Sequence, residues 1–225
     1  MARAFARIAF TPEVLAQQEA DGSAGSYARL LAPDVPAADA LGPAEAAFIA
    51  ARDGFYQASV SSSGWPYVQF RGGRPGFVHV LDGGTLAYAD LRGNRQHLSA
   101  GNLTTNARIT LFFMDYAERR RLKLWGEATL LRPEQDPDLA ARLAPDLPRK
   151  KVQRLVRIRV RAFDWNCPQH IPQRFTLEEI ETGVAGLQAR LAELEEQNDC
   201  LRSALESCDR DRTSRAPIST PRKEE

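Results

Sequence analysis

Cationic and amide side chains gather between Trp65 and Gln96, in a stretch that is rich in glycine. Guanidinium groups pair with phosphate oxygens through parallel hydrogen bonds, and glycines let backbone N–H groups approach a ligand closely. For any one arginine, a solvated position in a hairpin is an equal alternative, but the group as a whole favours a phosphate-bearing ligand. The residues concerned are Arg71, Arg92, Arg95, Asn94 and Gln96.

Other site chemistries find less support in the sequence. The run Arg-Gly-Gly-Arg-Pro-Gly lacks the helix-opening spacing of Walker and Rossmann loops, and no Ser-His-Asp or Cys-His-Asn set is evident. Cys167 and His170 are spaced as Cys-x-x-His, but the further ligands that a metal site needs are missing. No catalytic residue and no metal site are therefore assigned.

The size and composition of the chain limit its class. Its 225 residues suffice for one domain with appendages, and a hydrophobic content of 43% is typical of a globular protein. The net charge of +1 argues against capture of nucleic acid or of an anionic membrane. No segment approaches the roughly 18 apolar residues of a membrane span. Three cysteines, in no zinc-like spacing, fit the reducing cytoplasm better than a secreted protein.

Short segments of alternating hydrophobicity follow one another from about residue 55 to residue 165, with hairpin signals such as Asp-Gly-Gly between them. Two short helical segments, Asn94–Ala100 and Pro137–Leu143, interrupt them. This pattern predicts a mainly β protein with a closed antiparallel barrel rather than a parallel α/β sheet. The expected strands are Phe55–Ser61, Pro66–Phe70, Gly76–Leu81, Thr85–Asp90, Arg108–Tyr116, Arg121–Leu131 and Val152–Phe163.

The segments around the barrel have patterns of their own. The chain before residue 54 looks mainly helical, with Pro43 at the start of a helix over Ala44–Arg52. We expect the first ten residues to form a short strand or a docking arm. In the last expected strand, one face carries Val152, Val156, Ile158 and Val160, and the other carries Lys151, Gln153, Arg157, Arg159 and Arg161. The cationic face favours a solvated or inter-subunit surface over nucleic acid.

An apolar residue recurs at alternating spacings of three and four near the C-terminus. The seam residues are Leu177, Ile180, Val184, Leu187, Leu191, Leu194, Asn198, Leu201, Leu205 and Cys208. This pattern predicts a coiled coil, with a helix packed on its own barrel as the alternative. Asn198 falls at an a position, where a buried asparagine favours two parallel strands. The expected parts are a helical segment (1–54), a barrel (55–172), a coiled-coil helix (173–208) and a disordered tail (209–225).

The block from Trp65 to Gly126 resembles the pyridoxamine 5′-phosphate oxidase family of FMN-binding split barrels, and is closest to an uncharacterised subgroup. The resemblance implies an antiparallel split β-barrel with flanking short helices, in which two subunits form a homodimer and hold FMN in a groove between them. The matching sequences include Gly-Trp-Pro-Tyr-Val-Gln-Phe-Arg-Gly-Gly (64–73), Ala-Asp-Leu-Arg-Gly-Asn-Arg-Gln (89–96), Arg-Arg-Leu-Lys-Leu-Trp-Gly (120–126) and Trp-Asn-Cys-Pro-Gln-His-Ile (165–171).

The resemblance also implies roles for individual residues. Arg95 and Gln96 match a pair that contacts the FMN phosphate, although the second residue is Lys in the oxidases proper. Gln69 and Arg71 match residues beside the flavin ring and the phosphate. The remaining cofactor-binding residues implied are Asp90 and Asn94 of the same loop, Lys123 and Trp125 of a later strand, and Trp165, Asn166 and Gln169, which reach towards the cofactor of the same or the partner subunit.

The function implied by the resemblance is that of an FMN-dependent oxidoreductase. It would act on a small molecule, with NAD(P)H or oxygen as second partner, in the cytoplasm and without nucleic acid or membrane. The basic substrate-binding C-terminus of the vitamin B6 oxidases has no counterpart after Trp165, so that substrate is not carried over. Two alternatives remain: a non-catalytic flavin-binding or sensing module whose coiled coil recruits a partner, and a barrel that binds haem or a deazaflavin.

Overall fold

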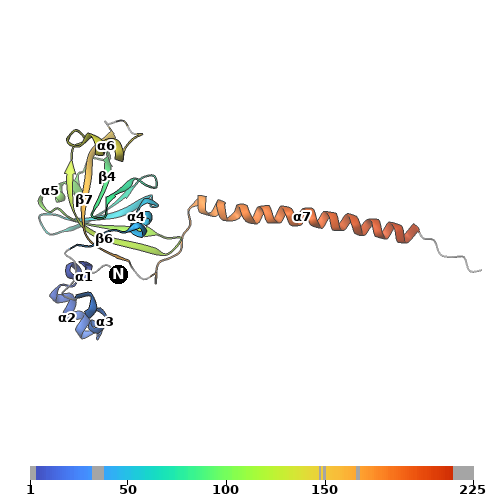
Figure 1. Ribbon diagram of the computed structural model, residues 1–225, viewed down its shortest axis with the longest axis horizontal. Helices are drawn as coiled ribbons and strands as arrows, with labels where there is room; N and C mark the ends of the chain where they lie inside the picture. Colours follow the sequence, from blue (N-terminus) through green and yellow to red (C-terminus); the bar gives the residue numbers. More distant parts are fainter. Residues whose placement is uncertain (1–3, 32–37, 147, 149–150, 166–167, 215–225) are drawn as a thin grey trace, which may run out of the picture. The chain divides into compact units, whose positions relative to one another are not determined.

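The computed structural model describes residues 4–31, 38–146, 148, 151–165 and 168–214; within the last helix, the side chains of residues 208, 209 and 211–214 are not described. The chain forms two compact units, the first ending at Gln173 and the second beginning at Arg174. The first unit holds the strands and the short helices, and the second holds one long helix (Figure 1).

One antiparallel sheet forms the body of the first unit, with the strand order β2-β1-β5-β6-β7-β4-β3. Within the described residues no pairing joins β2 to β3, so the barrel is split between these two edges. The predicted fold class is confirmed, and each strand boundary lies within two residues of its predicted position. The strands are β1 Gly54–Val60, β2 Pro66–Gly72, β3 Val78–Asp82, β4 Thr85–Leu91, β5 Arg108–Asp115, β6 Arg120–Leu131 and β7 Val152–Trp165.

The barrel interior is filled by the apolar residues of the alternating pattern. Leu111 and Phe113 of β5, Leu124 of β6 and Ile158 of β7 are fully buried in one core cluster. Because successive residues of a strand point to opposite faces, this alternation places the polar neighbours outside. Burial of such side chains contributes about 1.5–3 kcal/mol each, which makes the interior the main source of stability.

Gly126 allows β6 and β7 to approach at a bulge, where their register shifts. A Cβ atom at this position would lie 2.6 Å from Ile158 Cγ2 and 2.8 Å from the backbone oxygen of Arg159. These distances are shorter than van der Waals contact, so a side chain here would push the two strands apart. The missing side chain of Gly126 is therefore what lets the barrel bend at this point.

The helix α6, Pro137–Leu143, covers part of the outer face of the sheet. Its Leu139 and Leu143 pack with Leu155 of β7, which is fully buried, in a second apolar cluster. Asp136 begins the helix, because its side chain accepts a hydrogen bond from the Leu139 N–H. The cationic face predicted for β7 is thus covered around Leu155, whereas Arg157 and Arg159 are exposed.

The segment before the barrel is helical, as expected, but its first part is not a strand. Ala4–Ala9 forms a helix, α1, which packs on β7 and buries Ala4 and Ala6. Alanine favours helix more than any other residue, and the side chain of Asp39 holds this helix in place by accepting the Ala4 and Phe163 N–H groups at 3.0 and 3.2 Å. The elements that follow are α2 Pro12–Ala20, α3 Ala24–Tyr27 and η1 Ala28–Leu31.

The helix α4, Pro43–Ala50, begins at the predicted proline and ties the segment to the barrel. Its Glu45 accepts the backbone N–H of Gly42 at 2.9 Å and the indole N–H of Trp165 at 2.8 Å. Phe48 packs edge-to-face against the same indole. The two remaining short helices are α5 Leu98–Thr105 and η2 Pro133–Gln135.

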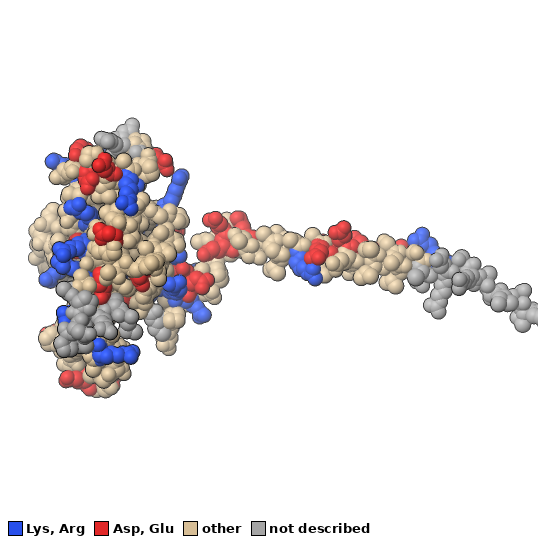
Figure 2. Space-filling view, in the orientation of Figure 1, with Lys and Arg blue, Asp and Glu red and all other residues tan. Residues whose placement is uncertain are grey.

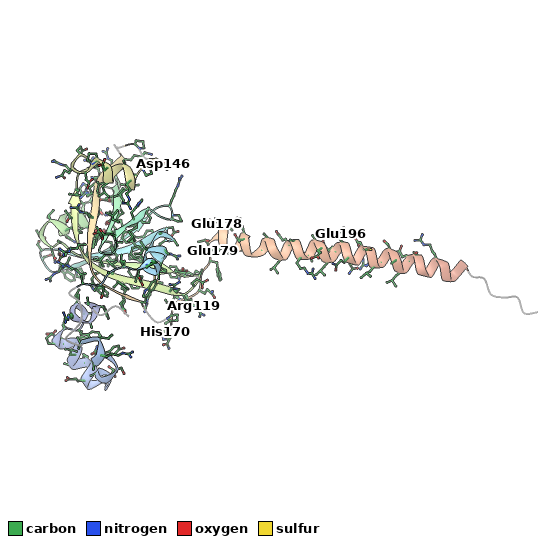
Figure 3. All side chains as sticks on the ribbon, viewed as in Figure 1. Arg119, Asp146, His170, Glu178, Glu179 and Glu196 are labelled. Atoms are coloured by element: carbon green, nitrogen blue, oxygen red, sulfur yellow. The ribbon has the colours of Figure 1, made fainter. Side chains whose placement is uncertain are left out.

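The second unit is the helix α7, Leu177–Ser214, which continues past the predicted end at residue 208. A capping box starts it: Thr176 Oγ1 accepts the Glu179 N–H, and Glu179 Oε2 accepts the Thr176 N–H. Acidic side chains gather at this end (Figure 2), among them Glu178 and Glu179 (Figure 3), where they complement the helix dipole. The apolar seam residues from Leu177 to Leu205 are exposed in the single chain. None of the described helices is both long and apolar enough to cross a membrane.

Candidate functional site

A small polar hollow of about 70 Å³ lies at one end of the barrel, where β4 ends and the chain turns into α5. Strand β2 forms one side of it, and β7 contributes Gln153 and Arg154 to its lining. The structure brings six of the predicted site residues together here, namely Gln69, Arg71, Asp90, Asn94, Arg95 and Gln96. Gln69 and Gln96, which are 27 positions apart in the sequence, therefore line the same hollow.

The loop between β4 and α5 has an unusual backbone. Arg95 and His97 have left-handed φ angles of 66° and 58°, a conformation that is uncommon outside glycine. The side chain of Asn94 holds the turn, because its Oδ1 accepts the Gln96 N–H at 3.1 Å and its amide donates to Gln96 Oε1. The helix predicted from Asn94 therefore starts only at Leu98, which is a correction to that prediction.

Asp90 lies between two arginines at the floor of the hollow. Its Oδ1 is 2.6 Å from Arg71 Nη1, and its Oδ2 is 3.1 Å from Arg154 Nε. The side chain of Asp90 is almost fully buried, and the two arginine side chains are about four-fifths buried. One carboxylate between two guanidinium groups leaves this cluster with a net positive charge.

One hydrogen-bond donor of this cluster is unpaired within the described residues. Arg71 Nε is buried and makes no hydrogen bond to any described residue. Such a donor costs about 1–3 kcal/mol when it is left unpaired. Arg71 lines the hollow, and an anionic oxygen that reached this donor would remove the cost. Together with the net positive charge of the cluster, this donor fits a phosphate group.

A chain of buried polar side chains continues from the hollow into the barrel. Tyr88 donates its hydroxyl hydrogen to Gln57 Oε1, and both side chains are fully buried. Burial raises the pKa of Tyr88, so the phenol stays protonated and acts as a donor. At the mouth of the barrel, Ser99 of α5 donates to Gln69 Oε1 at 2.9 Å. This contact fixes the orientation of the Gln69 amide beside the hollow.

Of the other predicted site residues, those that the structure describes lie outside this hollow. Lys123 forms an ion pair with Asp164 at 3.0 Å and lies over the rings of Phe5 and Trp125. The indole of Trp165 is engaged by Glu45, and Gln169 lies exposed in a turn. Asn166 lies outside the described residues. Within one chain, Lys123, Trp125, Trp165 and Gln169 do not line the hollow that holds Arg71, Arg95 and Arg154.

Arg154 is a charged residue of the hollow that was not predicted from the sequence. It occupies the same strand parity as Val156 and Ile158, which belong to the core cluster inside the barrel. A charged residue on the apolar face of a strand is unusual, because a buried charge needs a partner. That exception to the alternation is the signal that could have identified it.

The match of the chain to known proteins coincides with this barrel. Residues 41–165, more than half of the chain, match the family model described as pyridoxamine 5′-phosphate oxidase. The chain belongs to the pyridoxamine 5′-phosphate oxidase family. The matched range includes every strand of the described sheet and α4, α5 and α6, so the hollow lies within the part that the family shares.

Solved structures resemble the family domain at low sequence identity. HupZ of Group A Streptococcus is 15% identical, covers 60% of this chain and 100% of its own, and gives a TM-score of 0.46. An FMN-binding protein from Syntrophomonas wolfei subsp. wolfei is 8% identical over 54% of this chain and 83% of its own, with a TM-score of 0.44. A protein named F420 reductase is 18% identical over 52% and 94%, with a TM-score of 0.40. No curated protein matches the chain.

A second, larger hollow of about 630 Å³ shares Arg71 and Asp90 with the first. It extends along the β2–β3 loop towards the end of α6, near Asp146 (Figure 3). Phe77 lines it together with His79, and Arg142 brings a further cation. This family member therefore has a wide, partly aromatic space directly beside the small cationic hollow.

The pKa of His79, in the second hollow, predicts how the stability of the protein depends on pH. Burial, followed by the nearby Arg142, lowers the pKa of His79 below its ordinary value of 6.5. The unfolded chain therefore takes up this proton first as the pH falls, so stability should decrease below about pH 6.5 and level off beneath the folded-state pKa. We expect His79→Gln to remove this part of the acid sensitivity. Urea unfolding midpoints of both proteins between pH 8 and pH 5 measure it; parallel curves would contradict the prediction.

Proposed function

We propose that this chain is an FMN-binding flavoprotein that acts as an oxidoreductase on a small molecule. The observation that carries the proposal is the cationic hollow, in which the buried Arg71 Nε has no partner among the described residues. FMN, when bound, supplies the redox chemistry, while the protein holds and orients it. Arg95, Asn94 and Gln96 would hold the phosphate, and Gln69 and Arg71 would lie between the phosphate and the ring.

We further propose that the flavin site is completed by a second copy of the chain. The outer face of β1 and β2 carries exposed apolar side chains, including Tyr56, Val68 and Phe70, and Trp65 is 77% exposed. Apolar faces of this kind favour association. In the homodimer, Lys123, Trp125, Trp165, Asn166 and Gln169 would approach the cofactor of the same or the partner subunit.

The helix α7 supports the same assembly. In a parallel pair, Asn198 at its a position would face its own copy, and the two amides could hydrogen-bond. In an antiparallel pair with the same seam, Asn198 would face Leu187 and lose that partner. Arg190 at a g position could also reach Glu195 of the other helix, in place of its present Glu193. A parallel coiled coil is therefore the arrangement that we propose.

If the protein is a homodimer, its mass in solution should be twice that of the 25.0 kDa chain. Light scattering at micromolar concentration should give this value for the full chain. A variant that lacks residues 174–225 should remain dimeric, because the barrel face is intact. A monomeric full chain would overturn the dimer, whereas a monomeric truncated variant would leave only the coiled coil as its source.

The visible absorption spectrum of the purified protein tests the cofactor. Flavin bands, with FMN released on denaturation, are expected; a haem spectrum or a released deazaflavin would overturn the FMN assignment. Anaerobic mixing with NAD(P)H then tests the activity, since an oxidoreductase of this kind should bleach the flavin and recover its colour with oxygen.

The exposed seam of α7 favours one alternative, a non-catalytic flavin-binding or sensing module that recruits a partner. In that case the flavin would bind without reduction at a useful rate. The cysteine content fits a cytoplasmic location for either function.

A further inference from the structure

We propose that Arg154 of β7 is a phosphate ligand of the flavin site and that Asp90 is the positioning residue that presents Arg154 and Arg71 to it. The inference rests on the proposed function and deepens it. It adds β7, a strand that the sequence pattern does not connect with the cofactor. It also gives Asp90 a role different from direct contact with the ligand.

Asp90 is poorly suited to touch a phosphate. Both of its oxygens face guanidinium groups, at 2.6 Å from Arg71 Nη1 and 3.1 Å from Arg154 Nε. A carboxylate and a phosphate also repel each other because both are negative. The ion pairs instead fix two flexible side chains, which lowers the entropy lost when an anion binds.

Arg154 is held at two points. Strand pairing places it opposite Asp90, and its Nη2 is 3.0 Å from Nδ1 of His97 in the loop before α5. Its side chain lines the hollow and is 17% exposed. The guanidinium group is therefore held by Asp90 and His97 while its side chain lines the hollow.

The charges of the hollow fit a phosphate monoester. Arg71 and Arg154, less Asp90, leave one positive charge, and Arg95 adds a second. A phosphate monoester carries about −1.5 to −2 at pH 7. Without Arg154 the balance falls to one positive charge, so its contribution should appear in the affinity for the phosphate rather than for the flavin ring.

Two substitutions separate ligand binding from a purely structural role. FMN and riboflavin are titrated against the full-length protein, stripped of cofactor, by flavin fluorescence. Arg154→Gln should weaken FMN binding about tenfold, and riboflavin, which lacks the phosphate, should change less than twofold. Asp90→Asn preserves the shape of the side chain but removes its charge. Loss of the two ion pairs should weaken FMN binding about threefold to tenfold, although the hollow becomes more positive.

The control is Arg157→Gln, on the same strand but exposed on the outer face, which should leave both affinities unchanged. Equal losses of FMN and riboflavin in Arg154→Gln would overturn its role as a phosphate ligand. Tighter FMN binding by Asp90→Asn would show that Asp90 acts only through its charge, which would overturn the positioning role.

A further variant covers the case in which Arg154→Gln does not fold. Arg154→Lys keeps the charge but cannot pair with Asp90 and His97 through separate nitrogens. Relative to the wild type, Arg154→Lys should lose more affinity for FMN than for riboflavin. Unchanged FMN binding would overturn the proposal. If the wild type binds neither flavin, the proposed function itself fails. If it binds FMN and every variant does so equally, only this inference fails.

Discussion

Arg95→Ala is expected to weaken FMN binding by roughly 10- to 150-fold and to leave riboflavin binding almost unchanged. The residue lines the cationic hollow and is exposed, with no ion pair to any described carboxylate. Its guanidinium group is thus available to a ligand. A charged hydrogen bond of this kind contributes on the order of 1.5–3 kcal/mol, and about 1.4 kcal/mol corresponds to a factor of ten.

Arg92→Ala provides the matched control for Arg95. It belongs to the same loop and is also exposed, but its side chain does not line the hollow, and its backbone N–H is bonded to Lys151. We expect its loss to change FMN affinity by less than about threefold, because its charge would act on the phosphate only through screened long-range electrostatics. Isothermal titration of both flavins against the three proteins measures the effects. If Arg95→Ala weakens riboflavin as much as FMN, the phosphate contact is refuted.

Gly126→Ala is expected to destabilise the barrel by about 1–3 kcal/mol, the range of overpacked core positions. The added methyl group would lie 2.6 Å from Ile158 Cγ2 and 2.8 Å from the Arg159 backbone oxygen. The backbone of β7 cannot move away without straining its pairing with β4. In a domain of this size, the loss should lower the thermal midpoint by roughly 2–12 °C.

Gly101→Ala is the corresponding control. It lies inside α5, and nothing comes within 4 Å of its added Cβ atom. Because alanine favours helix over glycine by up to about 1 kcal/mol, this substitution should leave stability unchanged or raise it. Calorimetric scans of both variants give the comparison. An equal midpoint for Gly126→Ala and the wild type would show that the bulge absorbs a side chain.

Local sequence patterns predict the barrel well because its strands are joined by short turns with clear residue signals. Each strand boundary is within two residues of its expected position. The predicted start of α5 is wrong because the loop before it has a conformation that the local sequence does not signal. Two non-glycine residues, Arg95 and His97, adopt left-handed φ angles there, and tertiary contacts such as that of His97 with Arg154 accompany this conformation. Intrinsic propensity does not report such contacts.

The candidate site is predictable only in part, for a physical reason. Gln69 and Arg71 meet the loop from Asp90 to Gln96 through side-chain contacts, because Arg71 pairs with Asp90 and Ser99 donates to Gln69, although no described strand pairing joins β2 to β4. Arg154 comes from a strand about 60 residues later in the sequence, and only the sheet order brings it to Asp90. Trp125 and Trp165 do not reach the hollow within one chain, so their part in the site depends on the proposed dimer.

The position of β7 in the sheet has a consequence for synthesis of the chain. β7 is the last strand to leave the ribosome, yet it lies between β6 and β4. Until it emerges, the hairpin of β3 and β4 has no strand neighbour in the rest of the sheet. Leu86 and Tyr88, fully buried in the finished barrel, then lack their β7 partners Ile158 and Val156. Non-local pairing of this kind slows folding and prolongs exposure of apolar edges. Nascent chains that end before residue 152 should therefore depend on chaperones, and the barrel should close in one late step.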